Sequence, residues 1–215
     1  MYDCVIFDID GTILNTREAS LLAVQKAYQK ESGILLPIEE LEFTFGITTR
    51  ETAKVFNIKD PDKFIAEIDR QYHLLSDRTR LFSGILDMIR TLNAHNIYLG
   101  VVTSKTIWEY EHDFERFQLK PYFGRAMCVE HTQKHKPDPE PLQMFFLLTG
   151  MKPQNSLFIG DTINDSLCAR AAGVDFALAT WGAVENIPAQ YYPKDPGEAL
   201  KIVLETEFSL AGTCK

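Results

Sequence analysis

Long apolar runs, repeats and an excess of basic side chains are all missing from this 215-residue sequence. No apolar stretch approaches the roughly 20 residues that a membrane-spanning helix needs, which argues against an integral membrane protein. Lys and Arg total 22 against 30 Asp and Glu, so the formal net charge is −8. Because nucleic-acid backbones are held by Lys and Arg, this balance also argues against a nucleic-acid-binding surface. It leaves small phosphorylated ligands open, since local charge decides such sites.

Cysteine and histidine are scarce, and neither shows the spacing of a metal site. Cys4, Cys128, Cys168 and Cys214 lie far apart, and the first three stand in apolar contexts typical of buried thiols. The segment Met1-Tyr2-Asp3 leads directly into an apolar run and shows no signal-peptide pattern. We therefore expect reduced thiols and a cytoplasmic location.

The most informative feature that is present is a pair of carboxylates behind the first apolar run. Cys4-Val5-Ile6-Phe7 is typical of a buried strand, and Asp8 and Asp10 follow it directly, before Gly11-Thr12. Two like charges this close repel each other, and a bound cation or a shared proton would offset the repulsion. If the strand belongs to a parallel sheet, its end lies at the ligand crevice.

The rest of the chain divides into a helical block and an alternating block. Helical spacing covers residues 19–30, 49–56 and 61–75, and no strand is apparent between 16 and 77. Beyond Gly84, strands are predicted at 97–102, 126–129, 157–159 and 174–179, and helices at 85–92, 107–117, 141–149, 164–172 and 197–205. The alternation predicts an α/β fold with a Rossmann-like, doubly wound parallel sheet.

This arrangement separates the first strand from its partners in the sheet. We expect residues 1–15 and 82–215 to form the catalytic core, and residues 16–81 to form an inserted α-helical cap domain. The tail, residues 209–215, is expected to be loosely held.

A polar cluster follows each of four apolar runs. After the first come Asp8 and Asp10, and the others are followed by Thr103-Ser104-Lys105, Lys136-Pro137 and the pair Asp161 and Asp165. Since the carboxyl ends of parallel strands share one edge of a sheet, the four clusters should meet. The carboxylates suit a hard cation such as Mg²⁺, and the ammonium and hydroxyl groups suit a phosphoryl group. A metal-screened carboxylate can also act as a nucleophile.

Together the four motifs resemble those of the haloacid dehalogenase-like hydrolase superfamily, in particular phosphatases with a helical cap inserted after the first strand. The motifs are Asp8-Ile9-Asp10-Gly11-Thr12, Thr103-Ser104-Lys105, Lys136-Pro137 and Gly160-Asp161-Thr162-Ile163-Asn164-Asp165. The resemblance covers almost the whole chain. It implies that Asp8 is the nucleophile and a metal ligand, and that Asp10 is the general acid and base, whose backbone carbonyl also binds the metal.

The remaining motif residues receive roles from the same resemblance. Thr103 and Lys136 would hold the phosphoryl oxygens. Asp161 would ligate Mg²⁺, and Asp165 would support the metal directly or through water. The implied cofactor is therefore Mg²⁺, bound by Asp8, Asp10, Asp161 and Asp165.

Two further stretches, Gly160-Asp161-Thr162 and Thr180-Trp181-Gly182, resemble phosphoglycolate phosphatases and their pyrophosphatase relatives. Phosphomutases of the β-phosphoglucomutase type usually carry an acidic residue in place of Gly160, which favours hydrolysis here. We expect hydrolysis of a small, phosphoglycolate-like phosphate monoester through an aspartyl-phosphate intermediate. The alternatives are a sugar phosphomutase, a pyrophosphatase or nucleotidase of the same superfamily, and a non-catalytic regulatory protein that binds a small ligand.

The cap is expected to select the substrate, because the core contacts mainly the phosphoryl group. Thr48, Thr49 and Arg50 are candidates for touching the leaving group, and Arg50 could bind a carboxylate or a second phosphate. Thr12 and Ser104 complete the candidate substrate-binding residues. The expected partner is a small phosphorylated metabolite, without nucleic acid or membrane, and the protein is expected to be a monomer or homodimer.

Overall fold

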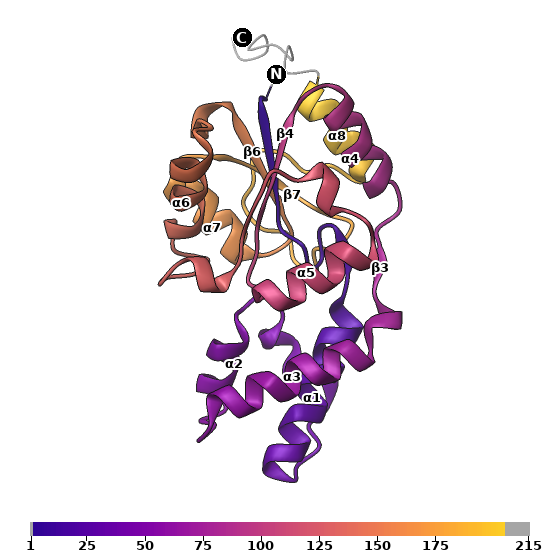
Figure 1. Cartoon of the computed structure of the whole chain (residues 1–215), viewed down its shortest axis with the longest axis vertical. Coiled ribbons are helices and arrows are strands. Elements are labelled where there is room, and N and C mark those ends of the chain that lie inside the picture. Colours follow the sequence, from indigo (N-terminus) through magenta and orange to yellow (C-terminus); the bar gives the residue numbers. More distant parts are fainter. Residues whose placement is uncertain (1, 205–215) are drawn as a thin grey trace, which may run out of the picture.

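A parallel β-sheet forms the centre of the molecule in the computed structural model, which describes residues 2–204. Within this part of the chain the five strands of the sheet run in the order β5-β4-β1-β6-β7. β1 lies in the middle and pairs in parallel with β4 and β6, as Figure 1 shows. The strands are β1 (Cys4–Phe7), β4 (Tyr98–Val102), β5 (Arg125–Met127), β6 (Ser156–Gly160) and β7 (Asp175–Leu178). The predicted α/β class with a doubly wound, Rossmann-like sheet is confirmed.

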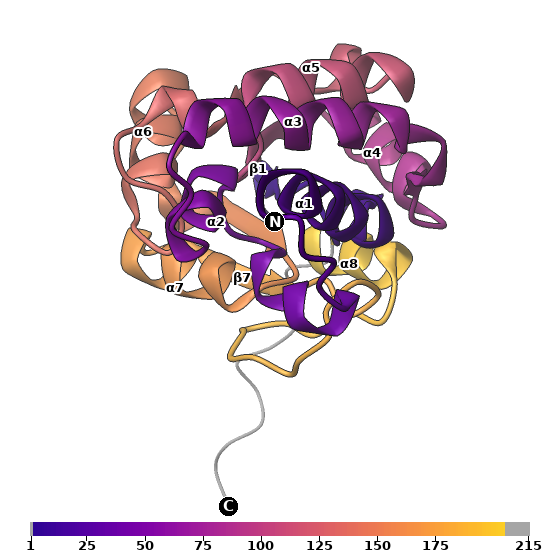
Figure 2. The same ribbon diagram turned by 90° about the horizontal axis from the view of Figure 1, so that it is seen from below.

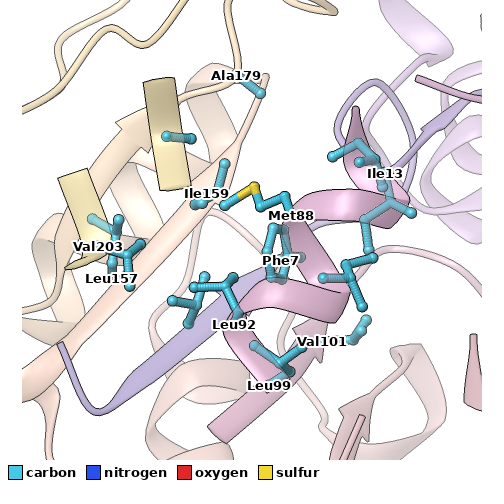
Figure 3. Close-up of a cluster of buried hydrophobic side chains, with 14 of the residues drawn as sticks. Phe7, Ile13, Met88, Leu92, Leu99, Val101, Leu157, Ile159, Ala179 and Val203 are labelled. Carbon is cyan, nitrogen blue, oxygen red and sulfur yellow. The ribbon is translucent and has the colours of Figure 1, made fainter. Parts of the chain in front are cut away.

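Helices cover both faces of the sheet, which explains why β1 is apolar at every position. Phe7 of β1 packs in a buried cluster with α4 (Ile85–Ala94), α5 (Ile107–Arg116) and α8 (Pro196–Leu204). Figure 3 shows part of this cluster, including Phe7 and Met88. Ile6, which points to the other face, packs with α6 (Glu140–Thr149) and α7 (Ile163–Ala172). Burial of each apolar side chain stabilises the fold by about 1.5–3 kcal/mol.

The helical block has a hydrophobic cluster of its own. The block consists of α1 (Arg17–Ser32), α2 (Thr49–Val55) and α3 (Pro61–Leu74), with 3₁₀ turns at Ile38–Thr44 and Ser76–Arg78. Phe64, Ile68 and Tyr72 of α3 pack against α1 in this cluster. Figure 1 shows the three helices below the carboxyl-terminal edge of the sheet, and Figure 2, which is seen from below, shows them in front of it. We call this block, residues 16–81, the cap.

Two very short strands join the cap to the sheet region. β2 (Leu14–Asn15) and β3 (Arg80–Leu81) pair in antiparallel fashion, with Asn15 opposite Arg80. The chain enters the cap after β2 and leaves it through β3. Strands of two residues are too short to show a hydrophobic period, so they were not predicted.

The predicted helices and strands match those of the structure to within two residues at each described end, and the end of β5 is one of the larger differences. β5 ends at Met127, and Val129, which was predicted to be its last residue, begins a 3₁₀ turn over Val129–His131. Residue 205 of the last predicted helix and the tail, residues 209–215, lie outside the described residues. Between residues 2 and 204, no helix combines the length and apolar character needed to cross a membrane. Cys4, Cys128 and Cys168 are buried free thiols, as predicted.

Candidate active site

The loop after β1 places Asp8 and Asp10 at the carboxyl edge of the sheet. The amide of Asp8 donates to the carbonyl of Ile159, which continues the pairing with β6. The chain then turns sharply at Gly11, where φ is +72°. A Cβ atom at Gly11 would lie only 2.0 Å from Oδ2 of Asp161. Glycine is therefore required here both by the backbone conformation and by the approach of the Asp161 carboxylate.

Three carboxylates, from the ends of β1 and β6 and from the start of α7, meet in the buried site. Asp8, Asp161 and Asp165 each offer an oxygen, and the three oxygens lie within 4.8 Å of one another. Burial raises the pKa of Asp8, and the Asp165 and Asp10 carboxylates raise it further, although Lys136 opposes them. Burial and the same crowding raise the pKa of Asp161 well above its usual range. These three buried carboxylates are suitable ligands for a hard divalent cation, which would relieve their repulsion.

Lys136 supplies the positive charge within this cluster. Its Nζ atom lies 3.0 Å from Oδ1 of Asp8 and 2.6 Å from Oδ1 of Asp165, and the side chain is almost fully buried. Burial lowers the pKa of Lys136, but the two carboxylates outweigh it and the net shift is upward. The ammonium group therefore stays charged beside Asp8, where it can pair with an anionic ligand.

The start of α7 holds Asp165 in place. Thr162 is the N-cap residue, and its backbone amide and hydroxyl donate to Oδ2 of Asp165 at 3.0 and 2.6 Å. Asp165 thus closes a capping box with one oxygen and contacts Lys136 with the other. A Cβ atom at Gly160 would lie 2.6 Å from Cγ of Asp165. A larger residue at position 160, such as an acidic one, would collide with Asp165.

Asp10 is held by a second lysine that was not among the predicted site residues. Nζ of Lys105 lies 3.0 Å from Oδ1 of Asp10, and the hydroxyl of Thr16 donates to the same oxygen at 2.6 Å. Lys105 also lies 3.3 Å from Asp113 and 3.9 Å from Glu109, and its side chain is only 3% exposed. The i, i+4, i+8 spacing of Lys105, Glu109 and Asp113 is a visible sign of this network, though only in retrospect.

The cap contacts this network directly. The Tyr72 hydroxyl, from α3, donates to Oδ2 of Asp113 at 3.0 Å, and the Lys105 ammonium lies 4.3 Å from the centre of the Tyr72 ring. Burial lowers the pKa of Lys105, but the surrounding groups, Asp10 foremost, raise it well above its usual value. Lys105 therefore joins the Asp10 carboxylate of the sheet edge to the cap.

The other predicted site residues of the core lie around the cluster. Thr103 is buried at the end of β4, and its hydroxyl accepts from the amide of Lys105 at 3.2 Å. The N-cap residue of α5 is Thr106, so the Thr103 side chain does not serve as the helix cap. The Thr12 hydroxyl donates to Asp161 at 3.3 Å. Because Thr12 is fully buried, it supports Asp161 and the loop and has no surface for a substrate.

A cavity separates the sheet edge from the cap. Its lining includes Asp8 and Asp10 from the core and Thr49 from the cap. Ser104 also lines it, and the Ser104 hydroxyl donates to the carbonyl of Gly46 at 3.4 Å, across the boundary between core and cap. A small molecule in this cavity would touch both carboxylates of the β1 loop.

Arg50 is not brought to this cavity. Its guanidinium pairs with Asp62 of α3 at 2.6 Å, and its side chain is 66% exposed. Thr48 caps α2 through a capping box with Glu51. Of the three cap candidates at positions 48–50, the structure places only Thr49 in the cavity lining.

Comparison with known proteins places this geometry in a family. The family profile of haloacid dehalogenase-like hydrolases matches residues 5–179. A "putative pyrophosphatase PpaX" of Caldanaerobacter subterraneus is 29% identical over 206 residues, covering 93% of each chain. An N-acetylmuramic acid 6-phosphate phosphatase of Pseudomonas putida is 28% identical over 189 residues, covering 84% of this chain and 83% of that one.

A solved structure shows the same similarity in three dimensions. A "putative phosphoglycolate phosphatase" from Lactobacillus plantarum superposes with a TM-score of 0.86 at 28% identity. The match covers 94% of this chain and 99% of the other. The family match spans both the cap and the four site motifs. This chain therefore belongs to the haloacid dehalogenase-like hydrolase family, as one of its phosphatases.

Proposed function

We propose that this phosphatase hydrolyses a small phosphate monoester with the help of Mg²⁺, through an aspartyl-phosphate formed on Asp8. The observation that carries the proposal is the meeting of Asp8, Asp161 and Asp165 around the Lys136 ammonium, beside a cavity that also contains Asp10. The carboxylates and the ammonium are suited to bind and neutralise a phosphoryl group, and Asp8 faces it as a nucleophile.

The proposed reaction has two steps. A carboxylate oxygen of Asp8 attacks phosphorus, and the bond between phosphorus and the ester oxygen breaks. The departing oxygen keeps the electron pair and takes a proton from Asp10. In the second step Asp10 takes a proton from water, whose oxygen attacks phosphorus. The bond between phosphorus and the Asp8 oxygen breaks, which releases inorganic phosphate and restores the Asp8 carboxylate.

The protein orients the groups that take part in these steps. Thr16 and Lys105 both bind Oδ1 of Asp10, which fixes that oxygen and leaves Oδ2 for proton transfer. Lys136 is proposed to hold a phosphoryl oxygen next to Asp8, with the Thr103 hydroxyl as a second donor. When bound, Mg²⁺ would be held by Asp8, Asp161 and Asp165 and would neutralise charge on the phosphoryl group.

A closing cap completes the proposal. The cap contacts the core through Tyr72 and Ser104, which lie on opposite sides of the boundary, and it covers the cavity. Covering the cavity would exclude bulk water from the aspartyl-phosphate until a single water is admitted. The cap would also contact the leaving group and so set the choice of phosphorylated metabolite.

Phosphate release from a set of phosphorylated metabolites, with Mg²⁺ present, tests the reaction. We expect the wild type to hydrolyse at least one compound and Asp8→Asn to lose this activity. Asp87→Asn is the matched control, because Asp87 is an exposed carboxylate on α4, away from the cavity. Equal release by the wild type and Asp8→Asn would remove Asp8 as the nucleophile.

Two alternatives give different results in the same assay. A phosphomutase would convert a sugar phosphate into its isomer with little phosphate release, whereas the contact between Gly160 and Asp165 leaves no space for the acidic residue usual at that position in such enzymes. A non-catalytic binding protein would bind a phosphorylated ligand without turnover. Pyrophosphate hydrolysis is a further alternative, because one relative is named a putative pyrophosphatase. Including pyrophosphate in the set of compounds tests it.

A further inference from the structure

The charged side chains that line the cavity between cap and core are mostly carboxylates, and they give it no net positive charge. Among the described residues that line it, Lys105 is the only one with a basic side chain. Three carboxylates surround its ammonium group, those of Asp10, Asp113 and Glu109, at 3.0, 3.3 and 3.9 Å. The charge of the Lys105 ammonium is therefore already balanced by carboxylates of the protein, and it leaves no excess positive charge for an anionic leaving group.

Three hydroxyl groups of the lining already donate their protons to backbone carbonyls. The Thr44 hydroxyl donates to the carbonyl of Leu41 at 2.7 Å, and the Thr52 hydroxyl donates to that of Thr48 at 3.2 Å. The Ser104 hydroxyl donates in the same way to a backbone carbonyl. A hydroxyl that has given its proton away keeps lone pairs, which suit an O–H donor of a ligand and repel a carboxylate.

A neighbouring hollow at the boundary between cap and core contains one further cation. Arg17 lines it together with Asp161, but its guanidinium pairs with Glu42 and lies 4.8 Å from the centre of the Phe45 ring. Glu185 lines the same hollow. Arg50, the residue expected to bind an acidic leaving group, points away toward Asp62. Each of the three basic side chains, Lys105, Arg17 and Arg50, is thus already paired with a carboxylate.

We infer that the leaving group of the substrate is an uncharged alcohol bearing hydroxyl groups, such as a polyol or a sugar, and that acidic leaving groups are disfavoured. The inference rests on the proposed phosphatase reaction and refines its substrate class. A glycolate or a second phosphate would have to lie against the Glu109 carboxylate without a compensating cation. A sugar hydroxyl, in contrast, can donate to that carboxylate and to the lining hydroxyls.

Two matched pairs of substrates test the inference on the wild type. In each pair the carbon skeleton is kept and a primary alcohol is replaced by a carboxylate: 2-hydroxyethyl phosphate against 2-phosphoglycolate, and sorbitol 6-phosphate against 6-phosphogluconate. We expect kcat/KM to be at least about tenfold higher for the uncharged member of the hydrolysed pair. A preference of the same size for the acidic member would overturn the inference.

Glu109→Gln provides a second, independent measurement. Glutamine can keep the capping box at the start of α5, so the fold should persist, while one negative charge leaves the cavity lining. We expect kcat/KM for the acidic substrate, relative to its uncharged partner, to rise about fivefold. Glu115→Gln, on the same helix and 81% exposed, is the control and should leave the ratio unchanged. An unchanged ratio in Glu109→Gln would count against the inference.

The two proposals fail in different ways. Hydrolysis that survives in Asp8→Asn, or no hydrolysis of any phosphate ester, overturns the proposed function together with the inference. Hydrolysis that requires Asp8 but prefers acidic leaving groups overturns the inference alone. Hydrolysis that requires Asp8 and prefers the uncharged partners supports both.

Discussion

Gly11 and Gly33 have nearly the same backbone conformation, with φ of +72° and +76°, but very different surroundings. Gly33 ends α1, and no described atom lies within 4 Å of where its Cβ would be. Gly11 lies against Asp161, and its Cβ would meet that carboxylate. Gly33 is needed to end a helix, whereas Gly11 is needed to leave space for the Asp161 side chain of the site.

This pair gives a prediction at the residue scale. Replacement of either glycine by alanine places a Cβ in the left-handed region, which costs about 1 kcal/mol. Gly11→Ala should in addition displace Asp161 and lower kcat by at least about 100-fold. Gly33→Ala should lose a similar amount of stability and keep its activity. Urea unfolding and steady-state kinetics of both variants measure this, and comparable activity in the two would contradict it.

At the scale of single helices, α2 and α7 begin with the same device. Both have a threonine N-cap and an acidic residue three positions later, Thr48 with Glu51 and Thr162 with Asp165. In α2 the capping box serves the helix alone. In α7 the acidic member of the box also belongs to the carboxylate cluster, so helix capping orients a candidate metal ligand.

We therefore expect Thr162→Ala to weaken Mg²⁺ binding by about tenfold, because Asp165 loses the hydroxyl donor that orients it. Thr48→Ala removes the equivalent donor from α2 and should cost about the same stability, about 1 kcal/mol, without changing Mg²⁺ affinity. Isothermal titration with Mg²⁺ compares the two variants. Thr162→Ser should restore binding, and equal affinities in Thr162→Ala and Thr48→Ala would contradict the expectation.

Asp69 is a partly buried carboxylate on α3. Its Oδ1 atom is buried without a hydrogen-bond partner among the described residues. Burial and the nearby Glu109 carboxylate raise the pKa of Asp69 to about 7. In the unfolded chain its pKa is about 3.9. Between these two values the folded state binds more protons than the unfolded state, so the stability contributed by Asp69 falls as the pH rises through this window.

Asp69→Asn should remove this dependence. We expect the variant to gain stability over the wild type at pH 8, where the buried carboxylate is charged, and to gain little at pH 4.5, where it is protonated in the folded protein. Urea unfolding at the two pH values measures the gain. A gain of equal size at both values would mean that the group does not titrate in this window.

At the scale of the whole molecule, the crowded carboxylates lower the stability of the metal-free fold and provide ligands for a metal. Asp8, Asp161 and Asp165 come from the ends of β1 and β6 and the start of α7, so the fold itself forces them together. Without a divalent cation their mutual repulsion opposes folding. A ligand that binds only the folded state adds about 2.7 kcal/mol of stability at 100 times its Kd.

This gives a prediction for metal removal. Mg²⁺ should raise the Tm of the wild type, and EDTA should reverse the rise and abolish hydrolysis. Asp161→Asn should raise the Tm of the metal-free protein by about 2–4 °C, because one like charge is removed, and should lose the rise with Mg²⁺. Differential scanning calorimetry of the wild type, Asp161→Asn and the control Asp87→Asn measures both effects. A full Mg²⁺ shift in Asp161→Asn would remove Asp161 as a ligand.

The sequence by itself determined the alternation of elements, and with it the edge at which the site forms. Apolar runs such as Val5–Phe7 are typical of a buried strand, and parallel strands end on the same side. The positions of Asp8, Lys136, Asp161 and Asp165 could thus be predicted to converge, because chain direction in the sheet fixes where each strand ends.

Only the tertiary structure decided how the cap meets that edge. Lys105 faces the cavity, whereas Arg50 pairs with Asp62 of α3. Lys105 and Arg50 are both charged residues in short polar stretches, so only the packing of the helices distinguishes them. The Lys105 network joins residues from the β1 loop, α3 and α5, and no local pattern links these elements. Helix propensity and hydrophobic period act over neighbouring residues, whereas ion pairs in a buried interface depend on the packing of distant ones.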